Sequence, residues 1–170
     1  VSAQNNCLDF HKTKCPASNT TGYHMSNDSR SATMRKGQSS EFRITIYQGK
    51  DYRISVCSDE SALGSTVHMR LIDYETEELL YDNKDFNYVK EFEFTVVQSR
   101  QIKISIEIPE DSAQKTTANT TGLISKNINQ GCVGVRIEEM STPKTGVPGL
   151  NPLSINATAI GIDPVAQRYI

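Results

Sequence analysis

The feature that most constrains this chain is the alternation of apolar and polar side chains in several short runs. Phe42, Ile44 and Ile46 alternate with polar residues, and the same period appears at 52–57 and at 102–108. Side chains of a β-strand point alternately to its two faces, so this period predicts strands with one buried face. The chain is therefore expected to be built from strands.

The number and spacing of these runs predict the fold class. Residues 48–51 read Gln-Gly-Lys-Asp, a tight turn that predicts a hairpin between strands at 42–46 and 52–56. Further strands are expected at 66–73, 78–81, 91–97, 101–108 and 131–139. Seven short strands separated by turn signals predict an all-β fold, an antiparallel β-sandwich or jelly roll.

Changes in composition divide the chain into three parts. Residues 1–37 show little periodicity and are expected to form an N-terminal lead-in that disulfides hold in place. The sandwich is expected to span residues 38–140, with a long polar insertion at 110–130. Residues 141–170 begin with a Pro- and Gly-containing linker and are expected to form an extended C-terminal tail.

Charge and motifs argue against several functional classes. Eighteen Lys and Arg residues oppose twenty Asp and Glu residues, which leaves a net charge of −2 without the basic excess that nucleic-acid binding needs. No run approaches the roughly 18 consecutive apolar residues of a membrane span. Neither a phosphate-binding loop nor a Gly-x-Ser-x-Gly elbow appears. We therefore expect a non-enzymatic protein without a cofactor, which neither binds nucleic acid nor spans a membrane.

The cysteines and the N-terminus both indicate export. An even number of cysteines in a chain rich in Ser, Thr and Asn is typical of an oxidising compartment, and the four are Cys7, Cys15, Cys57 and Cys132. Val1-Ser2-Ala3 before Gln4 resembles the small-residue end of a signal peptide, with cleavage near residues 3 and 4. We expect a protein of the periplasm, the outer-membrane surface or the cell surface.

The sequence leaves the pairing of the cysteines open among three arrangements. Cys57 and Cys132 lie out of phase with the apolar residues of their strands, which favours a bridge between them on the polar face and a local Cys7–Cys15 loop. Zinc is a weaker alternative. Cys7, His11 and Cys15 are spaced to share one helical face, and His24 could add a fourth ligand.

One histidine and one group of polar residues each allow two interpretations. His68 lies in phase with Arg70 in a predicted strand, so it is expected to face solvent instead of acting as a general base. Asp82, Asp85 and Asn87 offer oxygen ligands suited to calcium. That segment lacks the glycine and the terminal glutamate of an EF-hand loop, so a polar turn is the favoured interpretation.

Several motifs together carry a family resemblance. They are Phe10-His11-Lys12 with Cys15, Ser29-Arg30-Ser31-Ala32 before Lys36-Gly37-Gln38, the run 49–57, the run 79–83, Phe92-Glu93-Phe94, the run 131–135 and the run 142–146. With them, residues 10–146 resemble a family of small exported β-rich proteins of the cell envelope of Bacteroidota. This resemblance implies no catalytic residues. It implies O-glycosylation at Ser112, because Asp111-Ser112-Ala113 resembles the glycosylation signal of such proteins.

The tail distinguishes this chain from that family, whose members end soon after the Pro-Lys-Thr-Gly element. A strand-like segment gains order by pairing with a sheet edge. We therefore expect the tail to bind a protein partner or another copy through Leu153, Ile155, Ile160 and Ile162. The predicted function is an accessory or structural subunit of a cell-envelope or cell-surface assembly. The alternative is a carbohydrate-binding module, which the absence of Trp disfavours.

Overall fold

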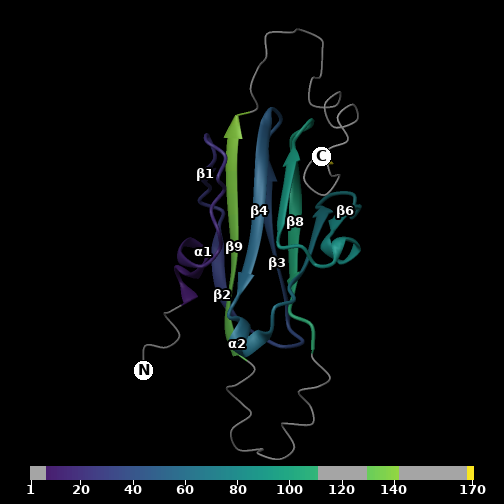
Figure 1. The fold of residues 1–170 in the computed structure, drawn as a ribbon. Coiled ribbons are helices and arrows are strands. Elements are labelled where there is room, and N and C mark those ends of the chain that lie inside the picture. Colours follow the sequence, from purple (N-terminus) through teal and green to yellow (C-terminus); the bar gives the residue numbers. More distant parts are fainter. Residues whose placement is uncertain (1–6, 111–129, 142–167) are drawn as a thin grey trace, which may run out of the picture.

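Two facing β-sheets make up the computed structural model, which describes residues 7–110, 130–141 and 168–170 (Figure 1). Sheet A contains six strands, which are β1 (His24–Met25), β2 (Arg30–Arg35), β4 (Lys50–Ser58), β7 (Glu91–Thr95), β9 (Gln130–Ser141) and β10 (Arg168–Tyr169). Sheet B contains four, which are β3 (Ser39–Ile46), β5 (His68–Asp73), β6 (Leu79–Asp82) and β8 (Arg100–Glu107). The short helices are α1 (Phe10–Thr13), α2 (Glu60–Leu63) and η2 (Asn83–Phe86). The predicted all-β sandwich is confirmed.

The strand order shows which strands lie at the edges of the two sheets. In sheet A, β9 pairs with β1 and β2 on one side and with β4 on the other, and β4 continues to β7 and β10. Sheet B has the order β3-β8-β5-β6. Every pair in the described residues is antiparallel except that of β10 with β7, which is parallel. The described helix-forming segments are too short to cross a membrane.

The predicted hairpin between β3 and β4 is wrong. β3 pairs with β8 over its full eight residues, whereas β4 lies between β9 and β7 in the other sheet. Residues 47–49 therefore connect the two sheets, and the Gly49 N–H donates to the Val96 carbonyl at 3.0 Å. Alternation identifies the buried face of a strand but not its neighbours, so two adjacent strands in the sequence can enter different sheets.

The sandwich also begins earlier than residue 38. Residues 24–25 and 30–35 of the expected lead-in form β1 and β2, and both pair with β9. Met34 is the only fully buried residue of β2. A strand with a single buried side chain has no alternating apolar set, and this is why the sequence pattern did not show it.

Stacked aromatic rings join the two sheets across the core. Tyr81 of sheet B lies 3.6 Å, centroid to centroid, from Phe92 of sheet A. Phe92 is followed by Phe94 at 5.3 Å, and Phe94 by Tyr52 at 5.6 Å. Aromatic pairs contribute beyond the area that they bury, so this row of rings fixes how the sheets face each other.

The last described residues return to their own sheet. The Ile170 N–H donates to the Thr95 carbonyl at 2.8 Å, and the Ile170 carbonyl accepts from the Val97 N–H at 2.7 Å. Ile170 is 6% exposed and belongs to the core. The expectation that the tail pairs with a neighbouring chain is therefore not met by residues 168–170. The four expected anchors and the expected glycosylation site lie outside the described residues, namely Leu153, Ile155, Ile160, Ile162 and Ser112.

Two disulfides tie the lead-in to the outer face of sheet A. Cys7 is bonded to Cys132 of β9, and Cys15 is bonded to Cys57 of β4. The expected pairing of Cys57 with Cys132 and of Cys7 with Cys15 is wrong. Cys57 lies opposite Gly134, so Cys57 and Cys132 are near each other on the same face, but the lead-in crosses that face and brings one cysteine to each of them.

A glycine allows the lead-in to approach this closely. A Cβ atom on Gly134 would lie 2.9 Å from the His11 Cα and 3.1 Å from the Sγ atoms of Cys15 and Cys57. Backbone and disulfide atoms cannot move away as a flexible side chain can. The contact between α1 and β9 therefore requires a residue without a side chain at this position.

Replacing that glycine tests the docking of the lead-in. Gly134→Ala is expected to lower the free energy of unfolding by about 1–3 kcal/mol, since an added methyl group overpacks the contact. Hydrogen exchange should accelerate in residues 10–16, and urea unfolding gives the free energy. Ser39→Ala, at an exposed position of β3, is the control and should have little effect. Unchanged exchange in the lead-in of Gly134→Ala would contradict this account.

Candidate functional site

The outer face of sheet A is closed by the lead-in over a buried ion pair. Arg53 and Glu138 are 4% and 2% exposed, and their Nη1 and Oε1 atoms lie 2.7 Å apart. Arg53 also donates to the Pro16 carbonyl at 3.0 Å and pairs with Glu91 at 2.8 Å. Burial alone would lower the pKa of Arg53, but these carboxylates outweigh it and raise the pKa. The lead-in thus covers the buried Arg53–Glu138 pair.

His11 connects the lead-in to β2. Its backbone N–H donates to the Ser31 Oγ at 2.7 Å, and its Nδ1 lies 2.6 Å from the same oxygen. Burial, and next the charge of Lys12, lower the pKa of His11, while Asp9 opposes and Arg136 adds to the lowering. The buried ring is therefore favoured in its neutral form.

The zinc alternative is wrong because both of its sulfur ligands are used elsewhere. Cys7 and Cys15 are bonded to other cysteines, and His24 lies apart from them in β1. A disulfide sulfur carries no thiolate charge, so it cannot act as the usual zinc ligand.

His68 does not face solvent freely as expected, because its side chain is 13% exposed and lies between two carboxylates. Its Nε2 is 2.8 Å from Asp82 Oδ1, and its Nδ1 is 3.1 Å from Glu107 Oε1. Asp82 also accepts from the Lys84 N–H, at 2.9 Å, and so begins η2. The weaker calcium candidates Asp82, Asp85 and Asn87 are the N-cap, a member and the C-cap of this 3-10 helix, so the favoured polar turn is a helical turn. Within the described ranges no three His, Cys, Asp or Glu side chains converge as a metal site.

One edge of the sandwich consists of strands with a single described neighbour each; we call it the open edge and define it as β2 and β3. β2 has β9 as its only described neighbour, and β3 has only β8. A slot of about 60 Å³ opens between these two edge strands. Its walls come from both sheets and comprise Arg30, Ser31, Ala32, Met34, Ser40, Phe42, Ile106, Val133 and Val135.

Arg30 lies at the mouth of this slot. Its guanidinium carbon is 4.1 Å from the centroid of the Phe42 ring, and its Nε donates to the Asp28 carbonyl at 3.2 Å. The cation therefore bridges from β2 to β3 over an apolar floor. The negative face of the ring attracts such a cation and holds it in this position.

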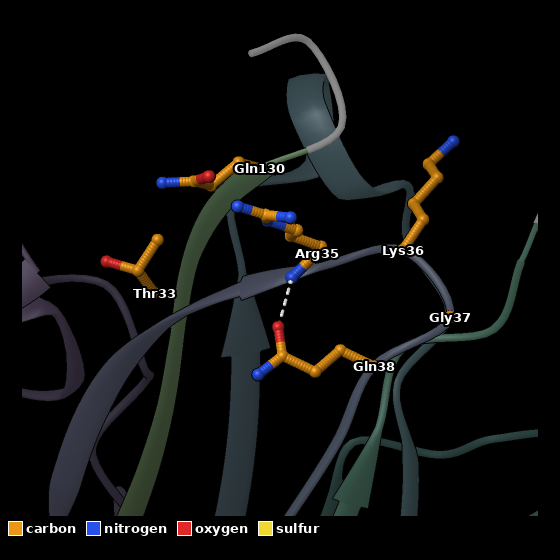
Figure 2. A pocket seen from close by; sticks show the side chains of 6 residues that line it. All are labelled: Thr33, Arg35, Lys36, Gly37, Gln38 and Gln130. Carbon is orange, nitrogen blue, oxygen red and sulfur yellow. Dashed lines mark hydrogen bonds between the residues drawn. The ribbon is translucent and has the colours of Figure 1, made fainter. Parts of the chain in front are cut away.

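A larger polar hollow of about 580 Å³ lies at the turn that joins β2 to β3 (Figure 2). Its lining residues are Thr33, Arg35, Lys36, Gly37, Gln38 and Gln130. The Gln38 side chain accepts from the Arg35 N–H at 2.9 Å, and the Gly37 N–H donates to the Ile108 carbonyl at 2.7 Å. Gly37 has a φ of +82°, which glycine adopts without strain, so the turn stays tight.

The open edge is positively charged in a chain that is slightly negative. Residues 30–46 contain four cations, Arg30, Arg35, Lys36 and Arg43, and one anion, Glu41, a net charge of +3. The sequence analysis considered only the charge of the whole chain and missed this segment. A window of 17 residues would have found the charge, but not the slot, whose walls come from four strands.

Exposed tyrosines bear on the carbohydrate alternative. Among the described aromatic residues, Tyr47 and Tyr74 are exposed. The Tyr74 ring lies 4.4 Å from the Arg43 guanidinium, and the Tyr47 ring lies 5.7 Å from Lys50 Nζ. One face of each ring is therefore already in contact with a cation.

Comparisons with known proteins give a structural likeness only. No family model and no curated protein sequence matches the chain. Among solved structures it is similar to the crystal structure of Aeromonas hydrophila PliG, a periplasmic lysozyme inhibitor of g-type lysozyme. The TM-score is 0.42 and the identity 9%, over 74% of this chain and 92% of that one. A likeness of this degree identifies neither the family nor a ligand of this chain.

The lowered pKa of His11 predicts a pH dependence of stability. The unfolded chain, with a His pKa near 6.5, binds a proton more readily than the folded protein. The contribution of His11 to the free energy of unfolding is therefore complete above pH 6.5. It is lost as the pH drops from 6.5 toward the pKa of His11 in the folded protein. His11→Asn places a polar atom near the Nδ1 position and cannot titrate, so it should lose this part of the dependence.

Urea unfolding at about pH 7.5 and about pH 5 measures this effect through the difference between the two free energies. His24→Asn is the control, because that side chain is 69% exposed, and it should keep the dependence of the parent protein. An identical pH dependence in His11→Asn and the parent would show that His11 does not contribute to it.

Proposed function

We propose that this protein is exported and acts without catalysis, as an accessory or structural subunit that binds a protein partner at the open edge. The observation that carries this proposal is the open edge itself, which combines two strands with one described neighbour each, a slot reaching core residues and, with the turn that joins the strands, a net charge of +3. Interfaces between proteins use an apolar pocket surrounded by polar and charged groups in this way.

Export is supported by the two disulfides. They close separations of 125 and 42 residues and join the lead-in to two different strands. Such bonds persist in the periplasm or at the cell surface and are rare in a reducing cytosol. Since residues 168–170 pair with β7 of their own sheet, the open edge replaces the tail as the proposed contact.

The Ser31–His11 contact supports a structural role over a catalytic one. Its distance would suit a nucleophile and its base. The Ser31 oxygen, however, also accepts the His11 backbone N–H, and within the described residues the imidazole has no hydrogen-bonded carboxylate to orient it. The pair instead joins α1 to β2.

Charge reversal at the open edge tests the binding function. In capture experiments with native envelope extract, Arg30→Glu/Arg35→Glu should reduce partner recovery at least tenfold. The introduced glutamates would repel the acidic surface of a partner that fits this basic edge. The matched control is Lys14→Glu/Lys84→Glu, which makes the same charge change at exposed positions away from this edge. Circular dichroism is used to check that both variants fold. Equal recovery by the two variants would place the partner elsewhere on the protein.

A fluorophosphonate probe tests the non-catalytic assignment. Because Ser31 lacks an activated base, we expect labelling no faster than that of the denatured protein, by intact-mass spectrometry. Ser31→Ala is the control that identifies the site of any label. Rapid labelling of Ser31 in the folded protein, lost in His11→Asn, would show that the pair is catalytic.

A further inference from the structure

The edge of β3 is long and regular, and among the described residues no strand pairs along its free side. Its register with β8 runs without a shift from Ser39 opposite Glu107 to Ile46 opposite Arg100. β3 contains neither proline nor bulge, and its residues 39–41 are exposed. An edge strand directs every second pair of N–H and C=O groups away from its one neighbour, where another strand can pair with them.

In the described residues the edge at β6 and the free side of β7 are both protected. β6 has four residues, and its pairing with β5 is interrupted by a register shift between Leu71 and Ile72. β10 covers the free side of β7. Short strands, bulges and covering segments are the usual ways to prevent strand addition. Their absence from β3 makes this edge the natural place for an added strand.

The slot beside β3 fits the side chains of such a strand. A strand that extends sheet B would point every second side chain toward the space between the sheets. There it would meet the slot, whose floor includes Phe42 and Ile106 of sheet B and Val133 of sheet A. The volume of about 60 Å³ is several times that needed by one water molecule, so the slot can accept a small aliphatic side chain.

The basic residues of the open edge determine which chemistry suits those side chains of the added strand that do not enter the slot. Arg30 of β2 lines the slot and lies over Phe42 of β3, Arg35 lines the adjoining hollow, and Arg43 lies on β3 itself. One anion, Glu41, lies among them, and it is 3.8 Å from Lys103. Acidic side chains would therefore be attracted along this edge, and basic ones repelled.

We infer that the open edge binds an extended, acidic segment of a protein partner, which adds to sheet B as a fifth strand beside β3. The small aliphatic side chains of the segment enter the slot, and its acidic side chains pair with the arginines. This inference rests on the proposed function and specifies its mode of binding. Main-chain hydrogen bonds supply affinity, and the slot and charges supply specificity.

Synthetic octapeptides test this mode directly. The probe alternates Asp and Val and is blocked at both ends, and it is compared with a Lys-Val octapeptide and with an Asp-Val octapeptide whose valines are N-methylated. We expect the acidic probe to bind at least tenfold more tightly than either comparison peptide, by isothermal titration. At saturation, alternate amides of β3 should gain at least tenfold protection from hydrogen exchange, which binding without strand addition would not produce.

Variants of the protein locate the contacts. Ala32→Leu, which fills the slot, and Arg30→Glu/Arg35→Glu should each weaken the acidic probe at least tenfold, while Lys14→Glu/Lys84→Glu should not. Two independent variants are used so that misfolding of one does not decide the result. Binding without protection of β3, or equal binding of the N-methylated peptide, would overturn strand addition.

The outcome separates this inference from the proposed function. If envelope extract still yields a partner that depends on Arg30 and Arg35 but no probe protects β3, the binding function stands and strand addition fails. If β3 is protected without a probe, and the effect rises with protein concentration together with a dimer in sedimentation, the occupant is a second copy and the inference is overturned. If no partner depends on this edge, both fail.

Discussion

The buried pair of Arg53 and Glu138 is the interaction on which the arrangement of this fold depends. Opposite charges at almost complete burial require hydrogen bonds as well as each other, and the lead-in supplies them from the Pro16 carbonyl and the Ser18 N–H. Removing one partner from such a pair costs about 3–5 kcal/mol, because the other charge stays buried alone. The lead-in must therefore remain in place, and the two disulfides hold it there. Covering this face also buries both faces of β4, which becomes the central strand of sheet A.

That cover determines where the rest of the surface can bind. With one face of sheet A closed, the described surface that remains includes the outer face of sheet B and the open edge. The lead-in reaches that edge too, because His11 contacts Ser31 of β2. β2 is thus paired with β9 and contacted by α1, while the slot opens beside it. For the binding that we propose, walls held in place in this way would avoid the entropic cost of ordering them when a ligand enters.

Much of the fold could be predicted from local pattern. Alternation located β3, β4, β5, β7 and β8 and the buried set of each, because one face of each meets the core. Alternation failed where contacts between distant parts of the chain determine which strands are neighbours and which faces are covered. Residues 42–46 and 52–56 read as a hairpin, yet they enter different sheets, and the polar face of the second is buried under the lead-in. The cysteine pairing failed for the same reason, because the phase of Cys57 and Cys132 shows only which face they occupy.

The candidate site could be predicted least, and β3 and β4 show why. Both strands alternate in the same way and both carry an arginine on the polar face, Arg43 and Arg53. Arg43 is exposed and lies against Tyr74, whereas Arg53 is buried against two carboxylates. Nothing within either strand distinguishes an edge from a centre, because that difference comes from the strands on either side. The charge of residues 30–46 is readable from the sequence, but the binding surface that we propose also depends on the strand order, which gives β2 and β3 one described neighbour each.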